Sequence, residues 1–165
     1  LGYKLKEMFV RIDQRTVYLK ALRDIVRDPK APAETRGRFM KECAFNHITD
    51  LFTKPDVRHI AEESTGLIED MVEFISEDIG AAASLMSLSS HDYYTYNHSV
   101  NVSVYSIAIC KRIFGMKKDL LVIAGMGGLL HDLGKKQIDT SIINKHGKLT
   151  PREWEQMKLH PRYGF

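Results

Sequence analysis

Apolar residues recur at three- and four-residue steps along most of the chain, the spacing that places side chains on one face of an α-helix. Proline and glycine residues between these stretches mark where helices stop. The residues 6–12, "KEMFVRI", alternate in part and predict a short strand or an extended lead-in. The remaining pattern predicts helices from Asp13 to Arg27, Ala33 to Phe52, Asp56 to Leu88, Tyr94 to Phe114, Asp119 to His131 and Thr150 to His160.

The start of the last predicted helix carries the clearest local signal in the chain. Thr150 stands at the N-cap position, Pro151 fills the first helical position, and Glu153 completes a capping box. This pattern predicts a helix whose first turn is fixed by its own side chains. Trp154 and Met157 are predicted to face inward from it.

These elements together predict an all-α fold, with the short strand confined to the N-terminus. We divide the chain into a mostly helical adjunct over residues 1–90 and a second region over residues 91–165, where a polar and aromatic stretch precedes a new apolar run. The apolar stripe of the helix predicted over residues 56–88 is typical of a buried core helix and also of a homodimer contact. Both interpretations stay open.

Composition indicates a folded domain, because 44% of the 165 residues are hydrophobic. The formal charge of +3 is too small to indicate DNA or RNA binding by charge alone. No apolar run reaches the ~18 residues that a membrane span needs. Cys43 and Cys110 lie in apolar helical patterns and are interpreted as reduced thiols of a cytoplasmic protein. The chain starts without Met and stops at Phe165, so we expect it to be a fragment.

A histidine and an aspartate end an apolar helix in "GGLLHDLGKK", residues 127–136. His131 and Asp132 are costly to bury unless they are paired or bound to an ion. A divalent cation just beyond the helix would satisfy both, whereas the alternative is a capping aspartate beside a chance histidine. Lys135 favours a phosphate as the substrate group, and Lys136 is interpreted as solvated. Gly134 is predicted to end the helix in the left-handed conformation.

Histidines that stand alone on a helix are more typical of solvated or hydrogen-bonded side chains than of ligands. His98 and His160 lie in helical patterns on either side of the doublet, so they are kept as candidate ligands beside His131 and Asp132. The ordinary interpretation is kept for the other four histidines, His47, His59, His91 and His146.

Three glycines interrupt the helix that leads to the doublet. Gly125, Gly127 and Gly128 each cost about 1 kcal/mol against alanine in a helix. No Gly-x-x-x-x-Gly-Lys pattern follows a strand here, so a phosphate-binding loop is not indicated. The glycines instead predict close packing of two helices behind the doublet.

Two stretches, "HSVNVSVYSIAI" and "LLHDLGKKQIDTSIINKHGKLTPREWEQMKLHPRYG", together resemble the HD-GYP family of bacterial signalling phosphodiesterases, a branch of the HD metal-dependent phosphohydrolases. The resemblance spans residues 95–164 and implies an HD-type helical bundle that is incomplete at its C-terminus. The roles that it implies are metal ligation by His98, His131 and His160, bridging of two metal ions by Asp132, contact with substrate phosphate by Lys135, and catalysis by Asp132 and Lys135.

The same resemblance implies a reaction. A hydroxide bridging two divalent ions would hydrolyse cyclic di-GMP to pGpG or GMP, with Fe or Mn as the first expectation and Zn, Ni or Co accepted by the same ligands. Some family members carry a glutamate that recruits a third metal where this chain has Tyr94, so two ions are expected here. A tandem histidine pair, a further aspartate and the Gly-Tyr-Pro loop are expected beyond Phe165.

Two other functions remain open beside the phosphodiesterase. One is a signalling module that has lost catalysis and binds nucleotide or partner proteins without turnover. The other is a phosphohydrolase for a different nucleotide, against which the Lys-x-Gly-Lys-Leu-Thr stretch and the Glu-Trp-x-x-Met-Lys-x-His-Pro stretch argue, because both are typical of the HD-GYP branch.

Overall fold

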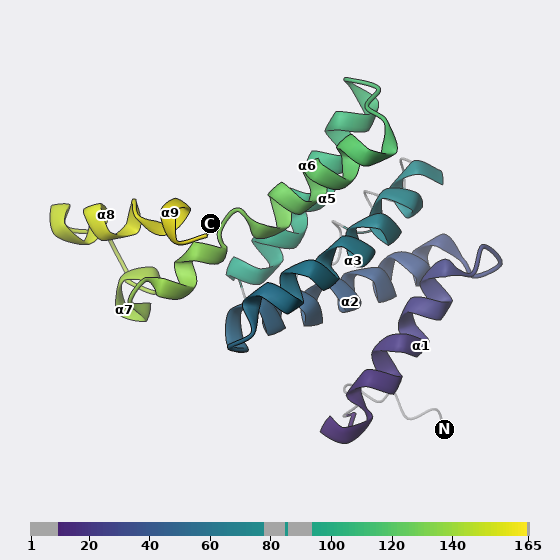
Figure 1. Ribbon diagram of the computed structural model, residues 1–165, viewed down its shortest axis with the longest axis horizontal. Helices are drawn as coiled ribbons and strands as arrows, with labels where there is room; N and C mark the ends of the chain where they lie inside the picture. Colours follow the sequence, from purple (N-terminus) through teal and green to yellow (C-terminus); the bar gives the residue numbers. More distant parts are fainter. Residues whose placement is uncertain (1–9, 78–84, 86–93, 165) are drawn as a thin grey trace, which may run out of the picture.

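The described part of the chain is built from packed helices (Figure 1). The structure is a computed structural model that describes residues 10–77, 85 and 94–164, and within these ranges it contains helices and no strand. The all-α prediction is therefore confirmed. The strand predicted over residues 6–12 lies mostly outside the described residues. Val10 and Arg11 have no regular structure, and Ile12 begins a 3-10 helix.

The helices follow the predicted order, although several ends differ by a few residues. The first long helix has Gln14 rather than Asp13 at its N-cap, and the helix predicted from Asp119 begins at Lys118. Among the described helices, none is both long and apolar enough to cross a membrane. The elements are η1 Ile12–Gln14, α1 Arg15–Arg27, α2 Ala33–Thr53, α3 Val57–Glu77, α5 Tyr94–Arg112, α6 Lys118–Leu130, η2 Leu133–Gln137, α7 Thr140–Ile143, α8 Pro151–Met157 and α9 His160–Tyr163.

One hydrophobic core joins α2 and α3 to α5 and α6, and α1 packs on α2 (Figure 1). Met40 of α2, Phe74 of α3 and Ile107 of α5 are among its largest fully buried side chains. Burial of each such side chain contributes about 1.5–3 kcal/mol, so this core holds α5 and α6 in place for the site at their end. The domain boundary predicted at residue 90 lies outside the described residues and stays a prediction.

The α5–α6 contact depends on two of the three glycines. A Cβ atom added to Gly128 would lie 2.7 Å from the Cα of Ser103, and one added to Gly125 would lie 2.9 Å from the side chain of Ile107 of α5 and 2.7 Å from that of Ile68 of α3. Ser103 Oγ also donates a 2.8 Å hydrogen bond to the Gly125 carbonyl across the interface. Close helix packing is therefore confirmed at these two positions. It is wrong for Gly127, where an added Cβ meets nothing within 4 Å.

The start of α8 has the predicted cap. Thr150 accepts from the backbone N–H of Glu153, and the Glu153 carboxylate accepts from the backbone N–H of Thr150. A further hydrogen bond from Lys145 contributes most to lowering the pKa of Glu153 to about 2. The inward orientation predicted for Trp154 is wrong, because 51% of that residue is exposed. Its helix contains no buried residue among those described.

Lys136 is not simply solvated, contrary to the sequence interpretation. Its ammonium group donates to the carbonyl of Leu51 at 3.2 Å and to the carbonyl of Lys54. These carbonyls lie at the C-terminal end of α2, where the helix dipole favours a cation. The lysine therefore joins η2, which follows the His-Asp doublet, to the α2–α3 turn.

His47 is a partly buried histidine that contributes to the fold. Its Nε2 atom lies 2.7 Å from Ser64 Oγ, and burial lowers its pKa from the ordinary value of 6.5. The unfolded chain therefore binds more protons than the folded one just below pH 6.5, so the free energy of unfolding should fall as pH drops through that window. We expect His47→Gln to flatten this fall, measured by thermal unfolding between pH 8 and pH 5. Equal slopes in both proteins would contradict the assignment.

Candidate metal centre

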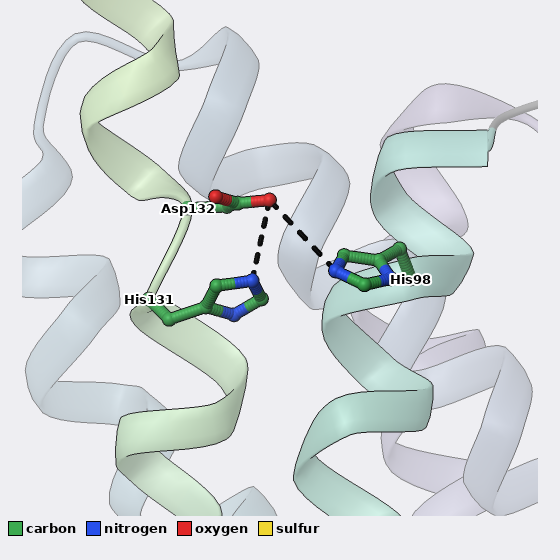
Figure 2. A group of neighbouring side chains, drawn as sticks. All are labelled: His98, His131 and Asp132. Carbon is green, nitrogen blue, oxygen red and sulfur yellow. Dashed lines mark ion pairs between the residues drawn. The ribbon is translucent and has the colours of Figure 1, made fainter. Parts of the chain in front are cut away.

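Three side chains, one from α5 and two from the residues that follow α6, converge at the end of α6 (Figure 2). His98 comes from α5, whereas His131 is the C-cap residue of α6 and Asp132 follows it. One potential ligand atom from each lies within 4.8 Å of those of the other two. Helix α6 stops at Leu130 and the chain turns into η2, so two consecutive residues can face the same point. The close α5–α6 packing brings His98 to it.

The Asp132 carboxylate occupies the middle of the cluster, and only 5% of its side chain is exposed. Its Oδ2 atom lies 3.2 Å from His131 Nε2 and 4.0 Å from His98 Nε2 (Figure 2). Its other oxygen, Oδ1, lies 3.5 Å from Nε2 of His160, a residue of α9. One carboxylate therefore presents a different oxygen to each of two histidine groups, which are His98 with His131 on one side and His160 on the other.

Backbone carbonyl groups set the orientation of two imidazole rings. His131 Nδ1 lies 2.8 Å from the Gly128 carbonyl oxygen, and His160 Nδ1 lies 2.8 Å from the Met157 carbonyl oxygen. A carbonyl oxygen can only accept, so each Nδ1 must carry the proton that is donated. When the ring is neutral, its Nε2 then has a free lone pair that points at Asp132. Such a hydrogen bond on the far nitrogen is typical of metal-ligating histidines.

This donor set fits a divalent cation. A lone pair on Nε2 and a carboxylate oxygen repel each other at 3.2–4.0 Å unless a positive charge lies between them. A metal ion that binds nitrogen and oxygen at about 2.0–2.2 Å holds neighbouring ligand atoms about 3.0–3.5 Å apart. His98, His131 and Asp132 need only small shifts to reach that geometry. The described cluster could therefore bind a metal ion.

Lys135 supplies the nearest cation among the described residues. Its Nζ atom lies 2.6 Å from Asp132 Oδ2, and 24% of its side chain is exposed. The pair offsets the charge of a carboxylate that is almost fully buried. The sequence placed Lys135 beside the site, which the structure bears out, whereas its contact with a substrate phosphate stays a prediction.

Gly134 does not end α6 in the left-handed conformation, so that prediction is wrong. The residue lies within η2, and the described glycines with positive φ are Gly115, which closes the region after α5, and Gly147. The chain changes direction at Asp132 instead, whose φ of −104° and ψ of 4° differ from those of a regular helix. The doublet itself is thus the break between the two helices.

The structure brings together all four predicted ligands and Lys135. Sequence reasoning missed the carbonyl groups of Gly128 and Met157, since a backbone acceptor has no residue type to recognise. The shared spacing of three residues before a histidine is the one signal that could have pointed to them. The side chain of Tyr94, on which the two-ion expectation depends, lies outside the described residues, as does His91.

Comparisons with known proteins agree with the architecture. Residues 95–165 match the model of the HD domain family. The chain superimposes with a TM-score of 0.76 on Bd1817, an HDG"Y"P protein from Bdellovibrio bacteriovorus, with 22% identity, covering 98% of this chain and 55% of that one. That likeness confirms the HD-type helical fold.

Two curated relatives extend the comparison. The chain is 38% identical over 104 residues to the cyclic di-GMP phosphodiesterase PA4108 of Pseudomonas aeruginosa, covering 61% of this chain and 25% of that protein. It is 34% identical over 70 residues to the 3'3'-cGAMP-specific phosphodiesterase 3 of Vibrio cholerae, covering 42% of this chain and 15% of that protein. The matched segments thus span a quarter or less of these relatives. The resemblance to HD-GYP proteins is confirmed.

Proposed function

We propose that the protein carrying this chain, whose residues 95–165 match the HD domain family, is a metal-dependent phosphodiesterase that hydrolyses cyclic di-GMP to pGpG or GMP. The observation that carries the proposal is the position of Asp132 between two histidine groups, with one oxygen toward each. Relatives named as cyclic di-GMP phosphodiesterases support the substrate class.

The residues divide into two ligand groups around that carboxylate. His98, His131 and Asp132 Oδ2 would hold one divalent ion, and Asp132 Oδ1 with His160 would contribute to holding a second. Fe and Mn are the first candidates, and the same donors accept Zn, Ni or Co. Two such ions, when bound, would polarise the phosphodiester and provide a nucleophilic water at neutral pH.

Lys135 would act on the substrate in this scheme. The Lys135 ammonium group, which has three rotatable donors on a flexible stem, would be repelled by a divalent ion bound near Asp132 Oδ2. Because the side chain is partly exposed, it can turn toward a bound phosphate while the backbone of Lys135 stays in η2. Lys135 would then neutralise phosphate charge, while Asp132 would orient both ion sites.

Residues 91–165 would in this proposal form the N-terminal part of an HD-GYP-like domain, and residues 1–90 a helical adjunct. The packing of α2 and α3 against α5 and α6 supports a structural role for the adjunct, because it supplies most of the core behind the site. A cyclic dinucleotide is the proposed partner, in a cytoplasmic bacterial setting. Other signalling proteins and a second copy of the chain remain proposals of the same kind.

A second candidate substrate follows from the names of the relatives. Two of them are named as 3'3'-cGAMP-specific phosphodiesterases, one at 34% and one at 30% identity. A mixed cyclic dinucleotide presents the same phosphodiester linkages to the site, so the described ligands do not distinguish it from cyclic di-GMP. The test of function therefore includes both.

The decisive experiment removes and restores the metal. The whole protein is stripped with a chelator, reloaded with Mn²⁺ or Fe²⁺, and given cyclic di-GMP, 3'3'-cGAMP or a linear nucleoside triphosphate. We expect chromatography to detect linear products from cyclic di-GMP in the reloaded protein alone. Binding of cyclic di-GMP without turnover under every metal would support the non-catalytic module instead. Preference for the linear nucleotide would support the other phosphohydrolase function.

A further inference from the structure

The geometry points to Gly134 as a positioning residue that determines whether His160 reaches Asp132, and thereby whether the centre holds one ion or two. The inference rests on the proposed two-ion function. Its starting point is a contact between backbones. A Cβ atom added to Gly134 would lie 1.8 Å from the His160 carbonyl oxygen and 2.7 Å from the Gly164 nitrogen.

That contact leaves no room for adjustment by a side chain. Real Cβ atoms essentially never approach another heavy atom closer than 3.0 Å, and both neighbours here are backbone atoms. Any side chain at position 134 must therefore move η2 and α9 apart by more than 1 Å. Gly134 is itself buried, which shows how directly α9 lies on it.

Besides the Lys145–Glu153 ion pair at the start of α8, few contacts fix the segment that carries His160 among the described residues. Neither α8 nor α9 contains a buried residue, so no apolar side chain anchors them in the described core. Helix α9 packs against η2, and α8 packs against α7, at the end of the molecule farthest from α1 (Figure 1). The position of His160 thus depends on the fit of two backbones at Gly134.

Displacement of α9 would act on one side of Asp132. His160 Nε2 lies 3.5 Å from Oδ1, and a shift of more than 1 Å removes it from any shared ion. His98 and His131 would keep their places, because α5 and α6 are held by the core and by their own close packing. A change at Gly134 should therefore weaken the ion site that includes His160 and leave the other site intact, although Gly134 would contact neither ion.

The test compares three variants of the whole protein. Mn²⁺ binding is measured by calorimetry and by metal analysis for Gly134→Ala, His160→Ala and Gly127→Ala. The last is a matched control in the same stretch, where an added Cβ meets nothing. We expect two ions in the wild type and in Gly127→Ala. In Gly134→Ala and His160→Ala, one of the two should bind at least about tenfold more weakly, the smallest loss that is typical when a residue that orients a metal ligand is changed.

Hydrogen exchange of the metal-free protein tests the position of α9 independently of metal binding. The backbone N–H groups of Arg162, Tyr163 and Gly164 donate to the carbonyls of Leu159 and His160 within α9. A four-residue helix has no stability alone, so undocking should expose these amides to hydrogen exchange. We expect metal-free Gly134→Ala to exchange them at least about tenfold faster than the wild type, with α6 amides unchanged, and His160→Ala to retain protection.

The outcomes are separable. The positioning role would be overturned if Gly134→Ala exchanged its α9 amides at the wild-type rate. It would also be overturned if that variant bound both ions with wild-type affinity, or if it unfolded globally. A wild-type protein that binds two ions yet hydrolyses no cyclic dinucleotide would overturn the proposed function and leave this inference standing. If the wild type bound no metal, the effect of Gly134 on the number of ions would be overturned, and the exchange result would decide only whether Gly134 positions α9.

Discussion

Asp132→Asn is expected to reduce hydrolysis of cyclic di-GMP by about 10²-fold or more, the loss that follows when one preorganised electrostatic partner is removed from a reaction centre. The asparagine has the same shape but lacks the negative charge that faces both histidine groups, and only one of its two positions remains an acceptor. Initial rates with Mn²⁺-loaded protein and the metal content of each variant measure the effect.

Asp139→Asn is the matched control for that experiment. Asp139 caps the nearby helix α7 by accepting from the backbone N–H of Ser141, and asparagine caps a helix almost as well as aspartate does. We expect wild-type rates and metal content in this control, and an unchanged circular dichroism spectrum in both variants. Normal turnover in Asp132→Asn would remove the carboxylate from the mechanism and with it the two-ion proposal.

Gly128→Ala should damage both the fold and the centre. The new Cβ would lie 2.7 Å from the Ser103 Cα, so α5 and α6 must separate, and overpacking of this kind costs about 1–3 kcal/mol. Since His98 lies on α5 and His131 ends α6, their separation should also weaken metal binding. Urea unfolding and Mn²⁺ titration measure the two effects on the same samples.

The neighbouring glycine provides the comparison. Gly127→Ala adds a methyl group where nothing lies within 4 Å, and alanine is the better helix former by about 1 kcal/mol. This variant should be as stable as the wild type or more stable, with unchanged metal binding. Equal loss of stability in both variants would contradict the prediction, because it would show that the close α5–α6 approach at position 128 is not the cause of the loss.

The helical fold was predictable because a 3.6-residue repeat of apolar side chains is visible in sequence without any partner. The burial of Met40, Phe74 and Ile107 follows from that repeat. The same reasoning gave a wrong orientation for Trp154, since an apolar residue on a helix faces inward only where another element lies against it. That condition concerns packing between distant segments, which spacing along the chain does not contain.

The members of the candidate centre were predictable through the family resemblance, and the structure gathers His98, Asp132 and His160 from parts of the chain far apart in sequence. The way in which they are held was not predictable. Gly134 was interpreted as a helix terminator because glycine is typical of that position, yet its lack of a side chain matters for a contact with His160. Lys136 likewise required the position of the end of α2.

The two ring-orienting hydrogen bonds have a consequence for how the sequence around the centre can vary. Their acceptors belong to the main chain, one turn before His131 and one turn before His160, so the rings keep their direction whatever side chain is attached there. The hydrogen bond itself consequently requires no particular side chain at position 157. Position 128 is constrained by the neighbouring helix alone. A relative that keeps the same backbone conformation at these two turns should thus keep the direction of both imidazole rings.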